Sequence, residues 1–200
     1  MKKNRTLCAL GSLVLMASIF QNHAACREPI SEASSAGREI SSVAQAEWKE
    51  FASKQGKFSV LMPGEPQEQI DDKEFPVVGK GQVHLFSFSN DSGFYLVGYL
   101  DIPGLAGQTQ AFCDGFGKGF LDSIGEGTAK GARGSVVKDT DITIGNSPGK
   151  EILIQVPTGL ATARAYFIKR RGYQLIAVPS GTDGASNVKK FLDSFKLTVQ

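Results

Sequence analysis

Residues 135–178 read SVVKDTDITIGNSPGKEILIQVPTGLATARAYFIKRRGYQLIAV and carry the clearest structural signal in the 200-residue chain. Short runs of β-branched, aliphatic and aromatic residues alternate here with turn signals such as Gly145-Asn146, a pattern typical of β-strands. A parallel pair needs a long crossover, so strands this close in sequence must pair antiparallel. The stretch therefore predicts four antiparallel strands, at 135–144, 150–157, 161–169 and 173–178.

The chain before this stretch adds strands of the same kind. Within residues 77–88, Val83 and Leu85 alternate with His84 and Phe86, so the two pairs are expected on opposite faces of a sheet. Three further strands are predicted, at Phe58–Met62, 77–88 and 94–100, the last two joined as a hairpin across 90–93.

Two amphipathic helices complete the expected elements. The first covers residues 105–124, where Phe112, Phe116 and Phe120 recur at helical spacing. The second follows a cap at Asp183 or Ser186, and its apolar residues share one stripe: Val188, Phe191, Leu192 and Phe195. The runs at 152–154 and 166–168 are apolar on both faces, which favours a helix on each side of the sheet. We expect one α+β domain, an antiparallel sheet of about six to seven strands packed as an α/β/α sandwich.

The N-terminus has the three parts of a secretory signal peptide. A basic start is followed by an apolar run at 7–20, too short for a transmembrane span, and then by the small residues Ala24 and Ala25. We expect residues 1–25 to be removed on export, which takes away three of the 22 basic residues and none of the 20 acidic ones. The formal net charge then changes from +2 to −1, a balance that argues against nucleic acid as a partner.

Cys26 follows the expected cleavage site and leaves two alternatives open. The residues Ala24-Ala25-Cys26 resemble the end of a bacterial lipobox, but His23 replaces the usual aliphatic residue and also fits an ordinary cleavage site poorly. Lipidation of Cys26 would tether the protein to a membrane face. An unmodified Cys26 would be free to form a disulfide with Cys113, although a small buried residue is the expected role of Cys113.

Residues 26–46 are rich in Ser and Ala and contain few large apolar side chains. Such a segment cannot bury enough surface to offset the entropy of ordering it, so we expect a flexible stalk. The expected folded domain is 47–200.

Several short motifs resemble those of exported bacterial proteins of unassigned function, in which an FSVLMPG strand follows a Trp. The matching stretches are WKEF (48–51), GKFSVLMPG (56–64), IGNSPGKE (144–151), RAYF (164–167), YQL (173–175) and KFLDSFK (190–196). More distantly, the chain is similar to the PsbP/Mog-type fold, an antiparallel sheet between helices. The distant resemblance implies a binding or accessory subunit, and neither resemblance implies a catalytic, cofactor-binding or metal-binding residue.

The residues themselves contain no recognisable catalytic or metal-binding motif. His84 is the single His after the expected cleavage, and its position within a strand favours a solvent-facing or hydrogen-bonded structural role. Asp71-Asp72 and the pair Asp139 and Asp141 lack the spacing of a calcium loop and are expected to be solvated loop or strand-end charges. We therefore predict no cofactor and no metal.

Two features of the sequence are candidate contact sites for a partner or a membrane. Residues 115–134 are rich in Gly without a phosphate-binding motif, and we expect a close helix–sheet contact followed by a mobile loop over 125–134, in which Lys130 and Arg133 carry charge. The basic run Lys169, Arg170 and Arg171 is expected at a hairpin turn, either as solvated charge or as a contact for anionic headgroups.

The leading hypothesis is a non-enzymatic, exported accessory or binding module of the cell envelope, partnered by an envelope protein. The alternative is a carrier or sensor of a small apolar ligand, bound between sheet and helix near Phe112, Phe116 and Phe120. An enzyme using carboxylates and Arg164 is a third hypothesis, which no motif supports. An enclosed apolar cavity would favour the carrier, and a filled core with an exposed apolar patch would favour the accessory module.

Overall fold

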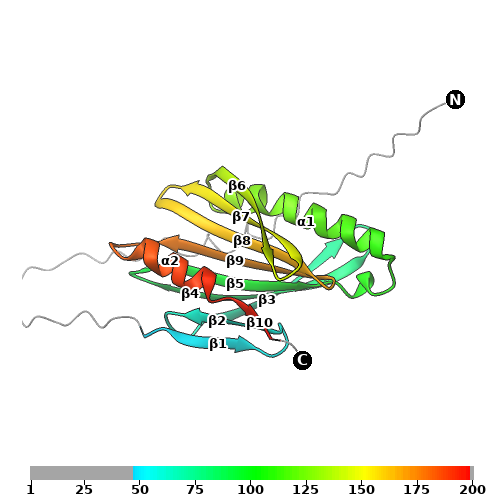
Figure 1. Ribbon diagram of the computed structural model, residues 1–200, viewed down its shortest axis with the longest axis horizontal. Helices are drawn as coiled ribbons and strands as arrows, with labels where there is room; N and C mark the ends of the chain where they lie inside the picture. Colours follow the sequence, from blue (N-terminus) through cyan, green and yellow to red (C-terminus); the bar gives the residue numbers. More distant parts are fainter. Residues whose placement is uncertain (1–46, 199–200) are drawn as a thin grey trace, which may run out of the picture.

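The computed structural model describes residues 47–198, which form three layers (Figure 1). The middle layer is a seven-stranded antiparallel sheet with the strand order β3-β4-β5-β9-β8-β7-β6. One helix, α1, covers one face, while α2 and a three-stranded sheet of order β1-β2-β10 cover the other. The predicted α+β class and the placement of one helix on each face are confirmed.

The bounds of the elements follow the predicted ranges closely in the second half of the chain. The large sheet consists of β3 (Gln67–Phe75), β4 (Gly79–Asn90), β5 (Gly93–Asp101), β6 (Ser135–Ile144), β7 (Ser147–Val156), β8 (Gly159–Ile168) and β9 (Arg171–Pro179). The small sheet consists of β1 (Lys49–Ser53), β2 (Phe58–Met62) and β10 (Lys196–Leu197). The helices are α1 (Gln110–Gly131), α2 (Gly184–Asp193) and a short 3-10 helix at Pro103–Leu105.

Alternation along the central strands builds two separate hydrophobic cores. On β4, Val83 and Leu85 pack beneath α1, while Phe86 packs on the other face, as predicted. The second core lies among the large sheet, the small sheet and α2, and it is dominated by aromatic rings. Both faces of the sheet are thus covered at its centre, which explains the apolar run on β8. The same expectation for β7 is wrong at Leu153, which is half-buried and packs in neither core.

Helix α1 begins later and ends later than its sequence pattern predicts. Thr109 is the N-cap and its side chain accepts a hydrogen bond from the amide of Phe112. The expected mobile loop over 125–134 is wrong, because the helix continues to Gly131. Gly125 and Thr128 are buried against the sheet, and Thr128 Oγ1 accepts a hydrogen bond of 2.8 Å from Gln174 on β9. Tertiary packing therefore overrides the low helix propensity of glycine.

Three strands were not predicted from the sequence: β1, β3 and β10. β3 reads QEQIDDKEF, is mostly exposed, and is held by backbone pairing with β4 at one edge of the sheet. Asp71 and Asp72 therefore lie within a strand rather than in a loop, and Asp139 and Asp141 likewise lie inside β6. An edge strand can be charged throughout, because it needs only one partner and no buried face.

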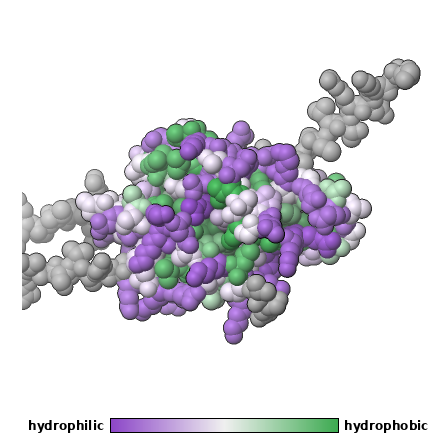
Figure 2. Space-filling model, viewed as in Figure 1, coloured by the Kyte–Doolittle hydropathy of each residue, from purple (hydrophilic) through white to green (hydrophobic). Residues whose placement is uncertain are grey.

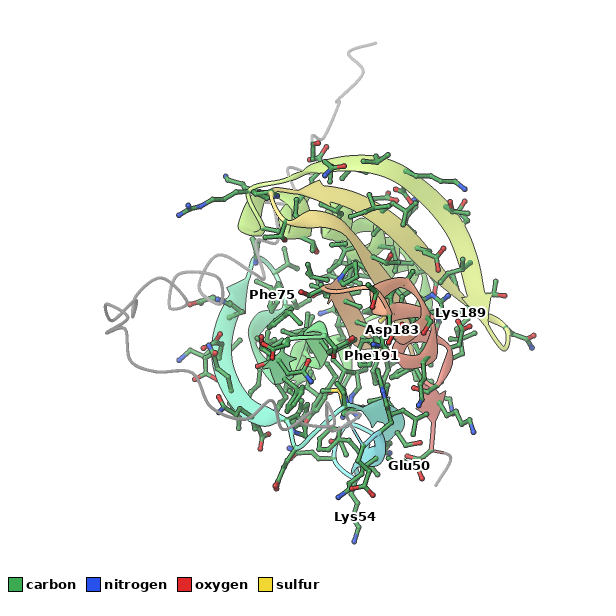
Figure 3. All side chains as sticks on the ribbon, turned by 90° about the vertical axis from the view of Figure 1, so that its left-hand side faces the viewer. Glu50, Lys54, Phe75, Asp183, Lys189 and Phe191 are labelled. Carbon is green, nitrogen blue, oxygen red and sulfur yellow. The ribbon has the colours of Figure 1, made fainter. Side chains whose placement is uncertain are left out.

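Helix α2 is attached to the sheet through its apolar stripe. Figure 3 shows Phe191 pointing to the interior and Lys189 lying at the surface. Phe191 packs on Tyr95, and Phe195, two residues beyond the helix, stacks on Tyr166. Asp183 occupies the predicted N-cap position. Within residues 47–198, neither helix has the length and apolar character that crossing a membrane requires.

Three sequence-based expectations lie outside the described residues: the signal peptide at 1–25, the stalk at 26–46 and the lipidation of Cys26. They stay predictions.

Candidate functional site

A cleft of about 790 Å³ lies between the N-terminal half of α1 and the hairpin formed by β6 and β7. Its apolar lining includes Leu121 from the helix, Phe167 from the end of β8, and Ile142 and Pro148 from the hairpin. The sheet extends past the helix at this corner, so a space open to solvent remains between them. We call it the helix cleft.

Gly117 explains why the helix lies so close to β8 at the helix cleft. A methyl group on Gly117 would overlap the ring of Phe167, whereas one on Gly115 would meet nothing within 4 Å. Gly117 therefore lets the helix backbone rest on the Phe167 ring. The expected role of the glycines in close helix–sheet packing is confirmed at Gly117, and nothing in the structure explains Gly115.

Most charged side chains of the helix cleft are already paired. Lys118 Nζ lies 2.7 Å from the carboxylate of Asp122, one turn along α1. Lys150 Nζ lies 3.0 Å from Asp139 and 3.4 Å from Asp141. The hydrogen bond to Asp139 raises the pKa of Lys150 above its ordinary value. Lys118 and Asp122 neutralise each other, whereas Lys150 and its two aspartates together carry a net charge of −1.

Lys169 and Arg170 form the two-residue turn between β8 and β9, and both line the helix cleft. Their φ angles are 47° and 70°, the left-handed conformation of a type I′ turn, which favours Asn-Gly. Within residues 47–198 neither side chain forms an ion pair, and Arg170 Nη1 lies 3.4 Å from the carbonyl oxygen of Ala106. The turn thus presents two exposed, uncompensated cations at the mouth of the cleft.

Arg171 differs from its two neighbours, although the sequence presents the three as one basic run. Its guanidinium donates two hydrogen bonds to Asp101, of 2.6 and 2.8 Å, and a third of 2.7 Å to the carbonyl of Gln55. It also lies 4.8 Å from the ring centre of Tyr99. Burial lowers the pKa of Arg171, but the bonds and charge of Asp101 outweigh burial and leave this pKa above its ordinary value. Arg171 is a structural residue that ties β9 to β5.

A second cleft, of about 520 Å³, lies on the other side of the same turn. Lys169 and Arg170 line it as well, together with Asp101, Ile102 and Thr198. We call it the lower cleft. The basic turn is therefore a ridge between two hollows.

The other predicted contact residues, Lys130 and Arg133, lie at the opposite end of α1. Both are exposed, on the last turn of the helix and just beyond it. An apolar patch lies nearby at the end of the sheet and comprises the exposed valines Val136 (40% exposed) and Val137 (60%). Leu160 (43%) is exposed at the same end but on the other face: Val136 is in register with Ile154 on the α1 face, whereas Leu160 pairs with the next residue, Gln155. Figure 2 shows a hydrophobic area over this end of the molecule, where β7 turns into β8.

His84 is held in place by its neighbours. It is 3% exposed, with Nδ1 3.2 Å from a carboxylate oxygen of Glu68 and Nε2 3.0 Å from the side-chain oxygen of Gln82. Its ring stacks on Tyr99 with 4.5 Å between centroids. The prediction of a hydrogen-bonded structural histidine is confirmed, although the residue is buried rather than facing solvent.

The other side chains that could take part in catalysis or metal binding also form structural contacts. Cys113 is buried, as predicted, and its thiol donates to the carbonyl of Leu105 at 3.6 Å. Arg164 binds Glu151 at 2.7 Å and Asp193 at 2.8 Å, which joins the sheet to α2. Within residues 47–198 no three His, Cys, Asp or Glu side chains are grouped so that they could hold a metal ion.

The aromatic stripe of α1 does not form the ligand pocket that its spacing suggested. Phe116 and Phe120 are buried in the core beneath the helix, where both pack on Phe167. Phe112 is half-buried against the same core. The helix cleft is instead lined by a neighbouring stripe that includes Gly117 and Leu121, because α1 is rotated to bury its phenylalanines.

Sequence reasoning identified the basic turn but not the cleft beside it. The lining comes from α1, the β6–β7 hairpin and residues 167–170, which are far apart along the chain. The one local signal was a hairpin turn occupied by Lys-Arg where Asn-Gly is preferred.

Comparison with known proteins finds a distant likeness of fold. No family model matches the chain, and no curated protein matches it. Among solved structures, the solution structure of cyanobacterial PsbP (CyanoP) from Synechocystis sp. PCC 6803 is similar with a TM-score of 0.47 and 11% sequence identity. The match covers 82% of this chain and 98% of that one. It is a remote likeness of the fold.

Proposed function

We propose that this protein is an exported, non-enzymatic accessory module of the cell envelope that docks on an envelope protein. The observation that carries the proposal is the apolar patch of Val136 and Val137 beside Lys130 and Arg133. Exposed aliphatic side chains gathered at one place, next to cations that have no ion-pair partner among residues 47–198, are typical of an interaction surface.

The charge around the patch favours a partner with an acidic surface. Lys130, Arg133 and Lys138 are exposed here, and an acidic partner would gain steering and specificity from them. A second copy of the chain fits less well at the free edge of β6. An antiparallel self-pairing centred on Asp139 or on Thr140 brings like charges together, with Asp139 opposite itself or opposite Asp141.

The engagement of the reactive side chains supports a non-enzymatic role. His84, Cys113 and Arg164 are each tied to structural partners, so none is placed to act on a bound substrate. The signal-peptide pattern of residues 1–25 supports export, and lipidation of Cys26 would hold the domain at a membrane face.

Site-specific photo-cross-linking of the full-length protein in cells tests the docking surface. A photoreactive residue at position 137 should give one reproducible protein adduct, which Lys130→Glu and Arg133→Glu should weaken. Position 77 is the matched control, because Val77 is 82% exposed at the turn beside the opposite sheet edge. Absence of an adduct at 137, or the same adduct at both positions, would contradict the proposal.

The carrier remains a second candidate function because of the helix cleft. Its volume of about 790 Å³ lies within the usual range for small-molecule sites, about 300–1,000 Å³. The cleft is open rather than enclosed, and it lies beside the phenylalanine stripe rather than on it. A carrier would hold its ligand there, between α1 and the sheet.

A further inference from the structure

We propose that the helix cleft binds an amphiphile with one apolar chain and an anionic head group, whose head is held by Lys169 and Arg170. This inference rests on the second proposed function, that of a carrier, and specifies its ligand.

The apolar part of such a ligand would lie along the floor of the cleft. Leu121 and Phe167 provide aliphatic and aromatic surface there, and Gly117 adds bare helix backbone beside them. Thr143 and Lys150 of the β6–β7 hairpin also line the cleft and would border the apolar chain on its sheet side. An apolar chain would displace water from this floor and gain the free energy of burial.

Two cations of the cleft have no carboxylate partner among the described residues, and they indicate an anionic head group. Lys118 is paired with Asp122, and Lys150 with two aspartates, so these lysines offer little net charge. Lys169 and Arg170 have no carboxylate partner within residues 47–198. A guanidinium beside an ammonium suits a carboxylate or phosphate head, because the guanidinium fork can bind two oxygens at once.

Backbone strain at the turn supports the same assignment. Asn-Gly is the preferred sequence for a two-residue hairpin turn of this type. Any residue other than glycine at positive φ destabilises the fold by about 1 kcal/mol or more. This turn nevertheless places Lys169 and Arg170 at φ angles of 47° and 70°. Strain of this kind is concentrated at binding and active sites, although single residues elsewhere in this chain, such as Val77, share it. Here two consecutive strained residues keep two cations between the two clefts.

Three probes separate the contributions of head and chain, using the purified full chain and isothermal titration calorimetry. Dodecanoate, kept below its critical micelle concentration, should bind saturably. Dodecanol has the chain without the charge, and acetate has the charge without the chain; each should bind at least tenfold more weakly. If dodecanol binds as tightly as dodecanoate, the anionic head group is not required, and the proposed carrier function still holds. If acetate binds as tightly as dodecanoate, the apolar chain is not required. If none of the three binds, both the inference and the carrier function fail.

The double variant Lys169→Asn/Arg170→Gly tests the turn without endangering the fold, because it installs the preferred turn residues. It should bind dodecanoate at least tenfold more weakly while its melting temperature stays the same or rises. Unchanged affinity in this variant would overturn the role of the two cations.

Two tryptophan substitutions locate the chain. Thr143 lines the helix cleft and Thr198 lines the lower cleft, and both are exposed. Thr143→Trp should obstruct binding and Thr198→Trp should leave it intact, while the reverse would overturn the placement. Competition with lysophosphatidylglycerol, a lipid with one chain, below its critical micelle concentration then identifies the source: displacement of dodecanoate indicates a single-chain membrane lipid, and its retention indicates a free carboxylate.

Discussion

Gly117 on α1 lies directly against the ring of Phe167 on β8, so closely that a side chain at residue 117 would overlap the ring. The contact sets the distance between the helix and the sheet at one end of the helix cleft. The same helix carries Gly115 two residues earlier, with open space around it. The pair offers a direct comparison of packing with intrinsic helix propensity.

Gly117→Ala should lower the free energy of unfolding by about 1–2 kcal/mol, because overpacking costs more than the helix propensity gained from alanine. Gly115→Ala should raise it by up to about 1 kcal/mol, since only propensity changes there. Urea denaturation of both variants measures the difference. Equal effects at the two positions would show that Gly117 is not a packing residue.

Val77 should be replaceable with a gain in stability. It has a φ of 77°, which is unfavourable for a β-branched residue, and its side chain is almost fully exposed. Val77→Gly or Val77→Asn should raise the free energy of unfolding by about 0.5–1 kcal/mol. Val137→Gly serves as the control, because Val137 lies in a strand, and it should bring no gain. A loss of thermal stability in both Val77 variants would contradict the expectation.

Phe191 and Phe195 should anchor the C-terminal segment to the second core, because both rings are buried. Truncation of either to alanine should cost about 3–5 kcal/mol of the free energy of unfolding. Phe112→Ala, at a half-buried position on α1, should cost clearly less. Unchanged melting temperatures in both the Phe191 and Phe195 variants would refute this anchoring role.

Asp193 should make a contribution to stability that disappears in acid. Its hydrogen bond with Lys189, together with that from Arg164, lowers its pKa below the ordinary 3.8. The unfolded chain therefore takes up the proton first as the pH falls, so the contribution is complete well above pH 3.8 and is lost as the pH drops through the lowered folded-state pKa.

The variant Asp193→Asn isolates this effect. It should be less stable than the wild type at pH 7, and the difference should shrink as the pH falls below about 4. Asp122→Asn is a useful control, because Asp122 forms a single exposed ion pair along one helix. A stability difference for the Asp193 variant that stays constant from pH 7 to pH 3 would contradict the prediction.

The strands from β6 to β9 could be predicted because their signal is local. Each run between turns carries enough β-branched, aliphatic and aromatic residues to indicate a strand, and tight turns permit only antiparallel pairing. The apolar stripe of α2 was recognisable for the same reason, since its period follows from helix geometry alone. These features depend on residues only a few positions apart.

Other elements could not be found in this way. β3 has no apolar alternation, and it is a strand because β4 provides hydrogen-bond partners along its whole length. The end of α1 is rich in glycine, and it is helical because Gly125 and Thr128 are buried against the sheet. In both cases the stabilising partner is remote in sequence.

Local sequence pattern is enough to establish the α+β class, the two amphipathic helices, the sites of most tight turns and the presence of a basic turn at Lys169-Arg170. The pairing of Arg171, the lack of ion pairing at its two neighbours within residues 47–198 and the cleft beside them depend on the folded arrangement. The physical reason is distance along the chain: Asp101, α1 and the β6–β7 hairpin reach the turn only after the sheet has assembled. Charge and periodicity can be recognised locally, whereas pairing and cavities belong to the folded molecule.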